Sequence, residues 1–391
     1  MRFQTNTSSN TGWCGLKILI IHPHLSVMGG SEVLTRILTY ELARLGHEVH
    51  ILTSSISESF FKQTSNIKIS FFEKGEHGLN DVHEKIAQIY LTLAKLFGKE
   101  TFDTALVMIQ EPIYNMLIRV VSPKTPTAIY IHYPFEEELT KENIVEFVKM
   151  FRFPGLYEKL YTIADVKIAN STYTARTLYR KFGITSYVVY PAIPWEFFKE
   201  EPDLDTIPGK TIITVGRFVP HKRIDTLLHM FREKIVREVP EAKLIIIGVK
   251  DPRYSSYYMK LREIAEKTKN VVFIDKPLTP LEMVKYYRMA RVYVHMRIGE
   301  HFGMAPVEAM LQAVIPIIPK ESGLAELISD GIDGYTYVTD EEALKRIIEI
   351  LKTNDSESIR NVRRRCYYKA QYFNPRRFAQ EILSYITFPR K

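Results

Sequence analysis

The strongest constraint on the fold is a regular alternation between short apolar segments and longer amphipathic ones along nearly the whole chain. The short segments are rich in β-branched residues, as buried strands are, and the segments between them have helical periodicity. Strands joined through helices favour parallel sheets with helices on both faces. The expected strands are 17–22, 47–53, 104–109, 127–132 and 164–170 in the first half, and 211–215, 243–247, 271–274, 292–295 and 315–318 in the second.

Two successive sets of strands within 391 residues predict an α/β protein of two Rossmann-like, doubly wound domains. We expect an N-terminal domain over residues 16–192 and a C-terminal domain over residues 210–373. The proline-containing, acidic segment 193–209 has no apolar periodicity and is interpreted as a linker. Residues 1–15 are polar, lack the apolar core of a signal peptide and are interpreted as a disordered leader.

The composition is that of an ordinary soluble globular protein, with 46% hydrophobic and 25% charged residues. A net charge of +8 favours an anionic partner, namely a phosphorylated substrate, an anionic membrane surface or nucleic acid. The positive charge is spread along the chain without a recognisable reading module, which argues against nucleic acid. Cys14 and Cys366 match neither a disulfide framework nor a metal site, and no apolar run of about 20 residues exists. We therefore expect a cytoplasmic protein without a spanning helix.

The segment Glu300–Glu308 places two carboxylates around a glycine loop, between an expected strand and a helix expected over 305–312. Such a loop points backbone N–H groups and the positive end of a helix dipole into the crevice at the strand ends, where phosphate binds. A carboxylate would repel phosphate, so both glutamates are interpreted as acceptors of hydrogen bonds from hydroxyl groups. A ligand with hydroxyl groups on both sides of a phosphate is a sugar nucleotide. Alternatively, Glu308 is an ordinary first-turn carboxylate and Glu300 a solvated loop residue.

Two segments of the first domain also lie where ligands of parallel sheets bind. Gly29 and Gly30 precede a helix expected over 31–45 and would let a loop approach a ligand; the alternative is a plain turn with Ser31 as the helix cap. His132 ends a buried strand and is interpreted as a hydrogen-bond donor to a sugar hydroxyl or as a positioning group, more than as a base. A purely structural histidine is the alternative.

Arg217 and Lys222 follow the first strand of the second domain, at the carboxyl edge of its sheet. Two cations in this place could neutralise a diphosphate as it leaves a reacting carbon. The alternative is a basic turn that binds nothing in particular.

The segment 140–162 combines aromatic and basic side chains at helical spacing. This pattern suits a helix that rests on an anionic membrane near a lipid acceptor, but it is also typical of a helix packed against its own sheet. The candidate membrane or acceptor contacts are Lys149, Phe151, Arg152 and Phe153. In the linker, Asp203-Leu204-Asp205 has the D-x-D form that can hold a divalent metal, yet solvated charge is the favoured interpretation.

Taken together, these features resemble the retaining glycosyltransferases of family 4, which have the two-domain GT-B fold. The resemblance extends from Leu16 to the C-terminus and rests on five motifs in the family's order: the glycine pair at 29–30, His132, Asn170-Ser171-Thr172, Gly216-Arg217 with Lys222, and Glu300-x7-Glu308. Within the family, His132-Tyr133-Pro134 and Glu300-His301-Phe302-Gly303 are similar to the eukaryotic mannosyltransferases that extend the lipid-linked oligosaccharide for asparagine-linked glycosylation.

The resemblance implies two domains that face each other across a cleft, with residues 374–391 forming a helix that crosses back to the N-terminal domain. Arg217 and Lys222 would bind the donor diphosphate, Glu300 the hydroxyls of the donor sugar and Glu308 the nucleotide ribose. With His132 near the reacting carbon, the expected catalytic residues are His132, Arg217, Lys222 and Glu300. The residues whose main chain would approach the donor are Gly29, Gly30, Gly303, Met304 and Ala305. The resemblance implies no metal or other cofactor.

The sequence departs from the family pattern at two places. Gly323-Leu324 stands where relatives often have two glycines, and Val314 stands where a glycine commonly ends the helix. The transmembrane anchor of the eukaryotic mannosyltransferases is also absent, so the expected membrane contact is peripheral, at the cytoplasmic face.

The expected function is transfer of a hexose, mannose from GDP-mannose, to a lipid-linked or polysaccharide glycan acceptor with retention at the anomeric carbon. A UDP-sugar-dependent family 4 transferase is the alternative for the donor. From another functional class, the alternative is a catalytically silent, membrane-associated partner protein that keeps the GT-B fold. The intact charges across the motifs favour the enzyme.

Overall fold

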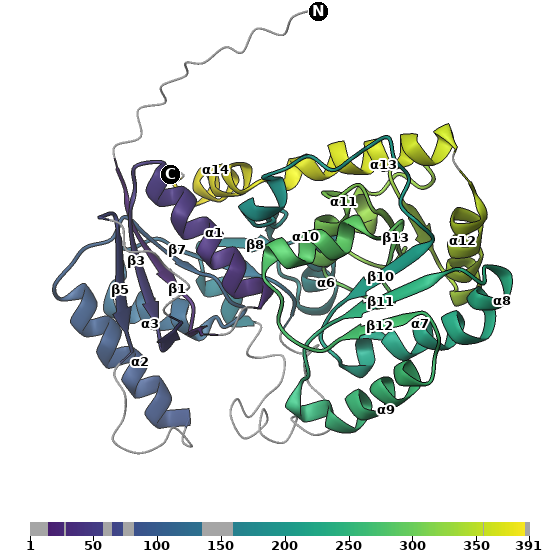
Figure 1. Ribbon diagram of the computed structural model, residues 1–391. Helices are drawn as coiled ribbons and strands as arrows, with labels where there is room; N and C mark the ends of the chain where they lie inside the picture. The colour runs from purple at the N-terminus through teal and green to yellow at the C-terminus, as the bar shows by residue number, and fades with distance from the viewer. Residues whose placement is uncertain are drawn as a thin grey trace, which may run out of the picture. The chain divides into compact units, whose positions relative to one another are not determined.

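The computed structural model of the protein describes residues 15–26, 29–57, 65–72, 82–134, 159–354 and 356–387. By their contacts, these residues group into two compact units. The first takes the described residues of Met1–Ile129, Glu146–Val166 and Tyr385–Lys391, and the second takes those of Tyr130–Val145 and Lys167–Ser384. In the described parts of the chain, the strands form a seven-stranded sheet, a six-stranded sheet and a short pairing of His24–Leu25 (β2) with Ser55–Ile56 (β4) (Figure 1).

The seven-stranded sheet has the order β5-β3-β1-β6-β7-β8-β9. Its central strand β1 pairs in parallel with β3 on one side and with β6 on the other. Ile18 to Ile21 of β1 are completely buried, which explains why this strand is continuously apolar instead of alternating. The strands are Lys17–Ile21 (β1), Glu48–Thr53 (β3), Ile67–Phe71 (β5), Thr104–Val107 (β6), Thr127–Ile131 (β7), Val166–Ala169 (β8) and Tyr187–Val188 (β9).

The six-stranded sheet has the order β12-β11-β10-β13-β14-β15, and its pairings are parallel. The strand order reverses between β10 and β13, so chain segments that leave these two strands diverge from one crevice. The strands are Thr211–Val215 (β10), Lys243–Ile247 (β11), Val271–Ile274 (β12), Val292–Val294 (β13), Ile315–Pro319 (β14) and Tyr335–Tyr337 (β15).

Helices cover both faces of the six-stranded sheet (Figure 1). On one face, Ile212 and Leu244 pack with apolar residues of α7, α9 and α12. On the other, Ile213 and Ile245 pack with residues of α10, α11 and α13. Successive side chains of a strand point to opposite faces, so each strand contributes to two cores. The helices of this unit are Ile224–Met230 (α7), Val236–Glu238 (α8), Ser255–Glu266 (α9), Pro280–Arg288 (α10), Met304–Met310 (α11), Asp340–Lys352 (α12) and Glu357–Ala370 (α13).

Local sequence signals account for several helix starts. Thr279 and Glu282 form a capping box at the start of α10, and Thr339 and Glu342 form another at the start of α12. The remaining helices are Gly30–Arg44 (α1), Val82–Phe97 (α2), Ile113–Val121 (α3), Thr172–Phe182 (α6) and Pro375–Ile386 (α14). Short 3₁₀ turns occupy Leu160–Ile163, Trp195–Phe198, Pro220–Lys222, Pro252–Tyr254, Ala325–Leu327 and Gln371–Phe373, and Phe231–Ile235 is a π-helical segment joining α7 to α8.

The predicted fold of two Rossmann-like parallel sheets is confirmed. Three strands of the two large sheets were not expected, namely β5, β9 and β15, and neither was the short β2–β4 pairing. Each of the three strands has exposed or half-exposed side chains at the edge of a sheet, so it lacks the continuous apolar run of a central strand. Within 193–209, Ile193 and Phe197 are buried in the core beside α10 and α11. The domain boundaries stay a prediction, and residues 1–14 of the expected leader lie outside the described residues.

Candidate functional site

The candidate site begins where β10 and β13 end, at the reversal of strand order in the six-stranded sheet. Ligands of open α/β sheets bind in the crevice outside such a reversal. β10 leads into 216–223 and β13 into 295–303, which together carry both predicted cations and the first predicted glutamate. The fold of the second unit therefore brings sequence-distant charged groups to one edge.

Glu300 is at the centre of these groups. Its Oε2 lies 2.5 Å from Nζ of Lys222 and 3.1 Å from Nε2 of His295. Its Oε1 lies 3.5 Å from a guanidinium nitrogen of Arg297. Only 9% of Glu300 is exposed, so it is not a solvated loop residue.

The electrostatics of the cluster keep Glu300 ionised. Burial alone would raise the pKa of the Glu300 carboxyl, but Lys222, the hydrogen bond from His295 and the charge of Arg297 together lower it well below its usual range. Burial lowers the pKa of His295, so this histidine is neutral at neutral pH. Because a carboxylate only accepts hydrogen bonds, His295 must carry its proton on Nε2 and donate it to Glu300.

Arg217 reaches the same edge but is held less firmly. Its guanidinium lies 3.5 Å from Oδ2 of Asp251, and 47% of its side chain is exposed. Asp251 is already engaged by Arg253, which approaches both of its carboxylate oxygens. The Arg217 guanidinium can therefore turn toward an anionic ligand at little cost in lost interactions.

The loop after Glu300 enters the short helix α11. Gly303 has φ of 92° and occupies the position before the helix, a left-handed conformation that favours glycine. Met304 is the first helical residue and Ala305 the second, so α11 begins one residue earlier than expected and ends at Met310. The predicted sequence of strand, glycine loop and helix is present, and the role of its backbone amides stays a prediction.

Glu308 lies on α11 and is half-buried. Its Oε2 accepts a hydrogen bond of 2.9 Å from the hydroxyl of Tyr287 on α10. Burial raises the pKa of Glu308 to about 7, although the Tyr287 hydrogen bond works in the opposite direction. Glu308 therefore differs from Glu300, because no cation is among the causes of its pKa shift and its charge state changes near neutral pH.

The main chain of His301, next to Glu300, is closely packed. Ser171, at the N-cap of α6, donates its hydroxyl to the His301 carbonyl at 2.5 Å. A Cβ added to Gly323 would lie 1.8 Å from that carbonyl oxygen and 2.7 Å from the Ser171 hydroxyl oxygen. Gly323 also donates its N–H to the Glu300 carbonyl at 2.8 Å. Gly323 is thus required by the close approach of two backbone segments.

His132 follows β7, as predicted, and is half-buried. Its carbonyl accepts a hydrogen bond of 2.8 Å from the side-chain amide of Asn170. Its ring meets the ring of Tyr130 edge to face, with centroids 5.0 Å apart. His132 belongs to the same contact unit as Glu300, and its role near the reacting carbon stays a prediction.

Gly29 and Gly30 lie in the other contact unit. Gly29 is the N-cap of α1, and Gly30 is its first residue, so Ser31 is inside the helix and not its cap. The Ser31 hydroxyl instead donates to Glu32 at 2.8 Å. The approach of the two glycines to a donor stays a prediction.

The candidate membrane contacts Lys149, Phe151, Arg152 and Phe153 lie outside the described residues. Among the residues that the structure does describe, no helix is both long enough and apolar enough to cross a membrane.

The aspartates of the D-x-D pair serve the local turn. Asp203 accepts hydrogen bonds from the backbone N–H groups of Asp205 and Thr206, and Asp205 forms an ion pair with Arg364 at 2.5 Å. These contacts give both carboxylates a structural role in the linker.

Three residues of the site were not expected from the sequence. His295 and Arg297 touch Glu300, and Tyr287 touches Glu308. The signal for His295 and Arg297 was their position at the end of the predicted strand 292–295 and just after it, shortly before Glu300. Tyr287 is 21 residues from Glu308 and fits the pattern of an ordinary buried helix residue, so no local pattern predicts its contact with Glu308.

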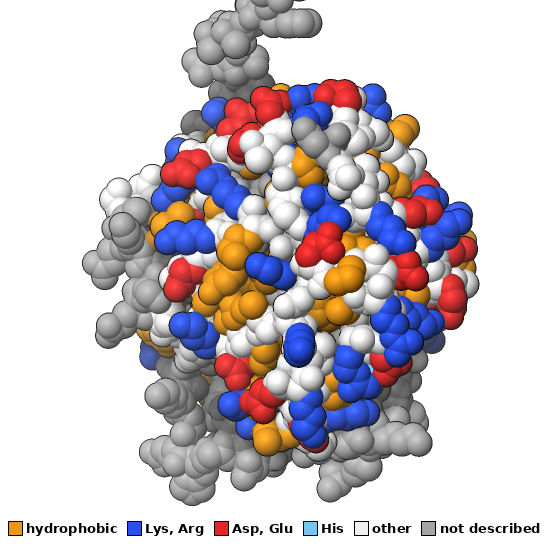
Figure 2. Space-filling view, turned by 45° about the vertical axis from the view of Figure 1, so that its right-hand side comes forward, with side chains coloured by type: hydrophobic (Ala, Val, Ile, Leu, Met, Phe, Trp, Pro, Cys, Tyr) orange, Lys and Arg blue, Asp and Glu red, His pale blue; other side chains and the backbone are white. Residues whose placement is uncertain are grey.

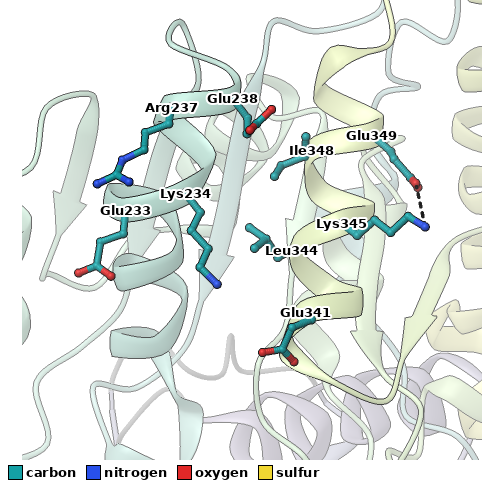
Figure 3. A pocket seen from close by; sticks show the side chains of 9 residues that line it. All are labelled: Glu233, Lys234, Arg237, Glu238, Glu341, Leu344, Lys345, Ile348 and Glu349. Atoms are coloured by element: carbon teal, nitrogen blue, oxygen red, sulfur yellow. Dashed lines mark ion pairs between the residues drawn. The ribbon is translucent and has the colours of Figure 1, made fainter.

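A hollow of about 500 Å³ lies between α12 and the segment formed by the π-helical turn and α8 (Figure 3). Leu344 and Ile348 form its apolar floor, and charged side chains of both signs surround them. Figure 2 likewise shows basic and acidic side chains interspersed over one face of the molecule. Because charges of both signs line it, the hollow does not indicate one class of ligand. It shares no residue with the Glu300 cluster.

Two family models match the chain. The model described as Glycosyltransferase Family 4 matches residues 28–197, and the model described as Glycosyl transferases group 1 matches residues 199–372.

Curated relatives include mannosyltransferases. The alpha-1,3/1,6-mannosyltransferase alg2 of Schizosaccharomyces pombe is 24% identical over 84% of this chain and 72% of its own length. The corresponding Saccharomyces cerevisiae enzyme is 23% identical over 81% of this chain and 72% of its own length. The GDP-Man:Man(3)GlcNAc(2)-PP-Dol alpha-1,2-mannosyltransferase of Homo sapiens is 24% identical over 61% of this chain and 52% of its own length.

Solved structures share the fold. Anabaena HepE in complex with UDP and glucose superimposes with a TM-score of 0.71 at 16% identity, covering 94% of this chain and 98% of the other. Sucrose-phosphate synthase from Thermosynechococcus elongatus gives 0.75 at 16% identity, again over 94% and 98%. These likenesses confirm the predicted two-domain α/β architecture.

Proposed function

We propose that this chain, a glycosyltransferase of the GT-B fold that resembles the eukaryotic mannosyltransferases of lipid-linked oligosaccharide assembly, transfers mannose from GDP-mannose to a lipid-linked glycan with retention at the anomeric carbon. The names of the curated relatives support the sugar and the class of acceptor. The donor base and the stereochemical outcome are our inference from the resemblance and the site.

One observation carries the proposal: two cations contact a single buried carboxylate at the reversal of strand order, and a third cation stands at the end of the neighbouring strand. Lys222 and Arg297 contact Glu300, while Arg217 stands at the end of the neighbouring strand with a half-exposed guanidinium. The cluster has an excess of positive charge, which suits a nucleoside diphosphate whose negative charge grows as it departs. A carboxylate among these cations can accept hydrogen bonds from sugar hydroxyls without repelling the diphosphate from the site.

The reaction would proceed with the protein supplying charge and geometry. The bond between the anomeric carbon and the diphosphate oxygen breaks, and the nucleoside diphosphate leaves with the electron pair beside Arg217 and Lys222. The acceptor hydroxyl oxygen forms the new bond on the same face and passes its proton to the departing diphosphate oxygen. Glu300 fixes the sugar through its hydroxyls, Glu308 fixes the ribose, and the backbone at Gly303 allows close approach.

The proposal has a direct test in the chemistry of the product. Purified protein, GDP-mannose and a lipid extract are combined, and the transferred mannose is analysed by NMR through the one-bond coupling at its anomeric carbon. Because GDP-mannose is an α-linked donor, retention predicts an α-mannoside, and a β-mannoside would overturn the retaining assignment. Thermal shifts with GDP, UDP and ADP and their sugars test the donor base; stabilisation by UDP-glucose alone would favour the UDP-sugar alternative.

Peripheral contact with the cytoplasmic face of a membrane is part of the proposal, because a lipid-linked acceptor must be reached at a membrane surface. The net charge of +8 supports contact with anionic lipid. Co-sedimentation with vesicles of anionic and neutral lipid tests it: binding to the anionic vesicles alone is expected, and equal recovery in the supernatant with both would contradict it.

A further inference from the structure

The motif Asn170-Ser171-Thr172 lies against the loop that carries Glu300, and its contacts with His301 and His132 belong to a larger set of hydrogen bonds. Asn170 follows β8, and Ser171 caps α6 by accepting the N–H of Thr174 at 3.0 Å. Thr174 Oγ1 lies 2.8 Å from Nδ1 of His301. Asn170, Ser171, Thr174 and His301 are each at most 5% exposed, so their hydrogen bonds form away from bulk water.

The direction of each hydrogen bond follows from its partners. The His132 carbonyl can only accept, so the Asn170 side chain must present its amide NH₂ group to it, at 2.8 Å. The amide oxygen of Asn170 then faces Thr174, whose hydroxyl donates to it at 2.6 Å. A threonine hydroxyl has one proton, and here it is already used. Thr174 Oγ1 must therefore accept from His301, which requires a proton on His301 Nδ1.

The backbone beside this ring is fixed by separate contacts. The Ser171 hydroxyl donates to the His301 carbonyl, and the Gly323 N–H donates to the Glu300 carbonyl. Gly323 leaves no room for the His301 carbonyl to move toward it. The ring and the main chain of His301, the residue that directly follows Glu300, are thus both held, and Ser171 links the two sets of contacts because its hydroxyl also lies 3.0 Å from Thr174 Oγ1.

We propose that His132, Asn170, Thr174 and His301 form a hydrogen-bond relay of fixed direction, which keeps His301 protonated on Nδ1 and positions the Glu300 loop for the donor. His301, Thr174 and Asn170 act here as positioning residues, since they work through Glu300. The relay also connects the main chain at His132 with the loop at Glu300, the two segments that carry the expected sugar contacts. The effect of the relay on donor binding rests on the proposed function, whereas the position of the proton on His301 Nδ1 does not.

Nitrogen NMR of protein labelled with ¹⁵N-histidine tests the relay without any donor. At a pH of about 8, imidazole tautomers are distinguished by their two ring-nitrogen shifts. We expect His301, assigned by its loss in His301→Asn protein, to be the Nδ1–H tautomer. Thr174→Val removes the acceptor and should convert His301 to the Nε2–H form or a mixture, while Thr174→Ser should restore the Nδ1–H form. An Nε2–H ring in the unsubstituted protein, or no change in Thr174→Val, would overturn the relay.

Ser171→Ala is the comparison variant: it removes the hydrogen bond to the His301 carbonyl and the 3.0 Å contact between Ser171 Oγ and Thr174 Oγ1, but it keeps the hydroxyl of Thr174 that accepts from His301. It should lower the melting temperature and keep His301 as the Nδ1–H tautomer, whereas a tautomer change in this variant would contradict the assigned direction.

The positioning role has its own readout in donor affinity. Thr174→Val should weaken binding of GDP-mannose by roughly fivefold, the effect of losing one net hydrogen bond, and Thr174→Ser should recover most of it. Unchanged GDP-mannose binding in Thr174→Val protein with a switched tautomer would overturn the positioning role. If the protein without substitution bound no nucleotide sugar, the proposed function would fail while the tautomer result stood.

Discussion

The side-chain nitrogen of Lys222 lies 2.5 Å from Oε2 of Glu300, across 78 residues of sequence. Burial lowers the pKa of Lys222, and the charge of Glu300 partly offsets that effect. A lysine that is partly desolvated beside one carboxylate is poised to share its charge with a bound diphosphate. Glu300 is the expected contact to the donor sugar and Lys222 the expected contact to the diphosphate. The ion pair therefore holds these two contacts next to each other.

Lys222→Ala should lower kcat/KM for the donor by about 10²–10³-fold, because it removes a cation from the place where negative charge develops. Glu300 keeps His295 and Arg297 as partners, so the variant should stay folded, which a melting curve checks. Lys345→Ala is the matched control, since the Lys345 side chain is 76% exposed and its ammonium forms a 3.9 Å pair with Glu349 on the same helix. Comparable turnover in the two variants would refute a role for Lys222 in charge stabilisation.

Donor affinity should rise with pH through the titration of Glu308. Its pKa is raised to about 7, so the carboxylate that accepts from the ribose hydroxyls is depleted below that pH and restored above it. The donor KM should accordingly fall between about pH 6 and about pH 8. In Glu308→Gln protein this dependence should vanish, and in Tyr287→Phe protein its midpoint should move upward, because the Tyr287 hydrogen bond holds the pKa down. A KM profile that is the same in all three proteins would show that Glu308 is not its source.

Gly323→Ala should destabilise the fold by about 1–3 kcal/mol, because the new Cβ cannot coexist with the His301 carbonyl in its present position. Urea unfolding measures this change. Gly209→Ala is the control: among the described residues, no atom outside Gly209 and its two chain neighbours lies within 4 Å of the added Cβ, and a change within about 0.5 kcal/mol is expected. Equal stability of the two variants would mean that the loop relaxes without cost.

Sugar transfer should persist after removal of divalent metals. Arg217, Lys222 and Arg297 supply the positive charge that a metal provides in other transferases, so we propose that none is required. Activity assayed after extensive dialysis against EDTA should be within about twofold of the untreated protein. Loss of activity that added Mg²⁺ or Mn²⁺ restores would show that a metal takes part.

The sequence predicts the sheets well because central parallel strands are buried on both faces and must be continuously apolar, as Ile18 to Ile21 are. It also places Arg217, Lys222 and Glu300 at one sheet edge, because strand ends align. Local patterns do not specify how distant segments contact one another. The hydrogen bond between Thr174 and His301 spans 127 residues and depends on how α6 meets the loop after β13, and the Tyr287–Glu308 contact depends on how two helices pack. Such partners follow from tertiary packing and have no sequence signature.

The most direct test of the central claim is transfer of radiolabelled mannose from GDP-mannose into the lipid fraction of a membrane extract, compared between the unsubstituted protein and Lys222→Ala. We predict incorporation of label by the unsubstituted protein and its near-complete loss in the variant. A catalytically silent partner protein would incorporate no label from GDP-mannose or from UDP-glucose. That result, obtained with folded protein, would contradict the assignment of this site as the centre of sugar transfer.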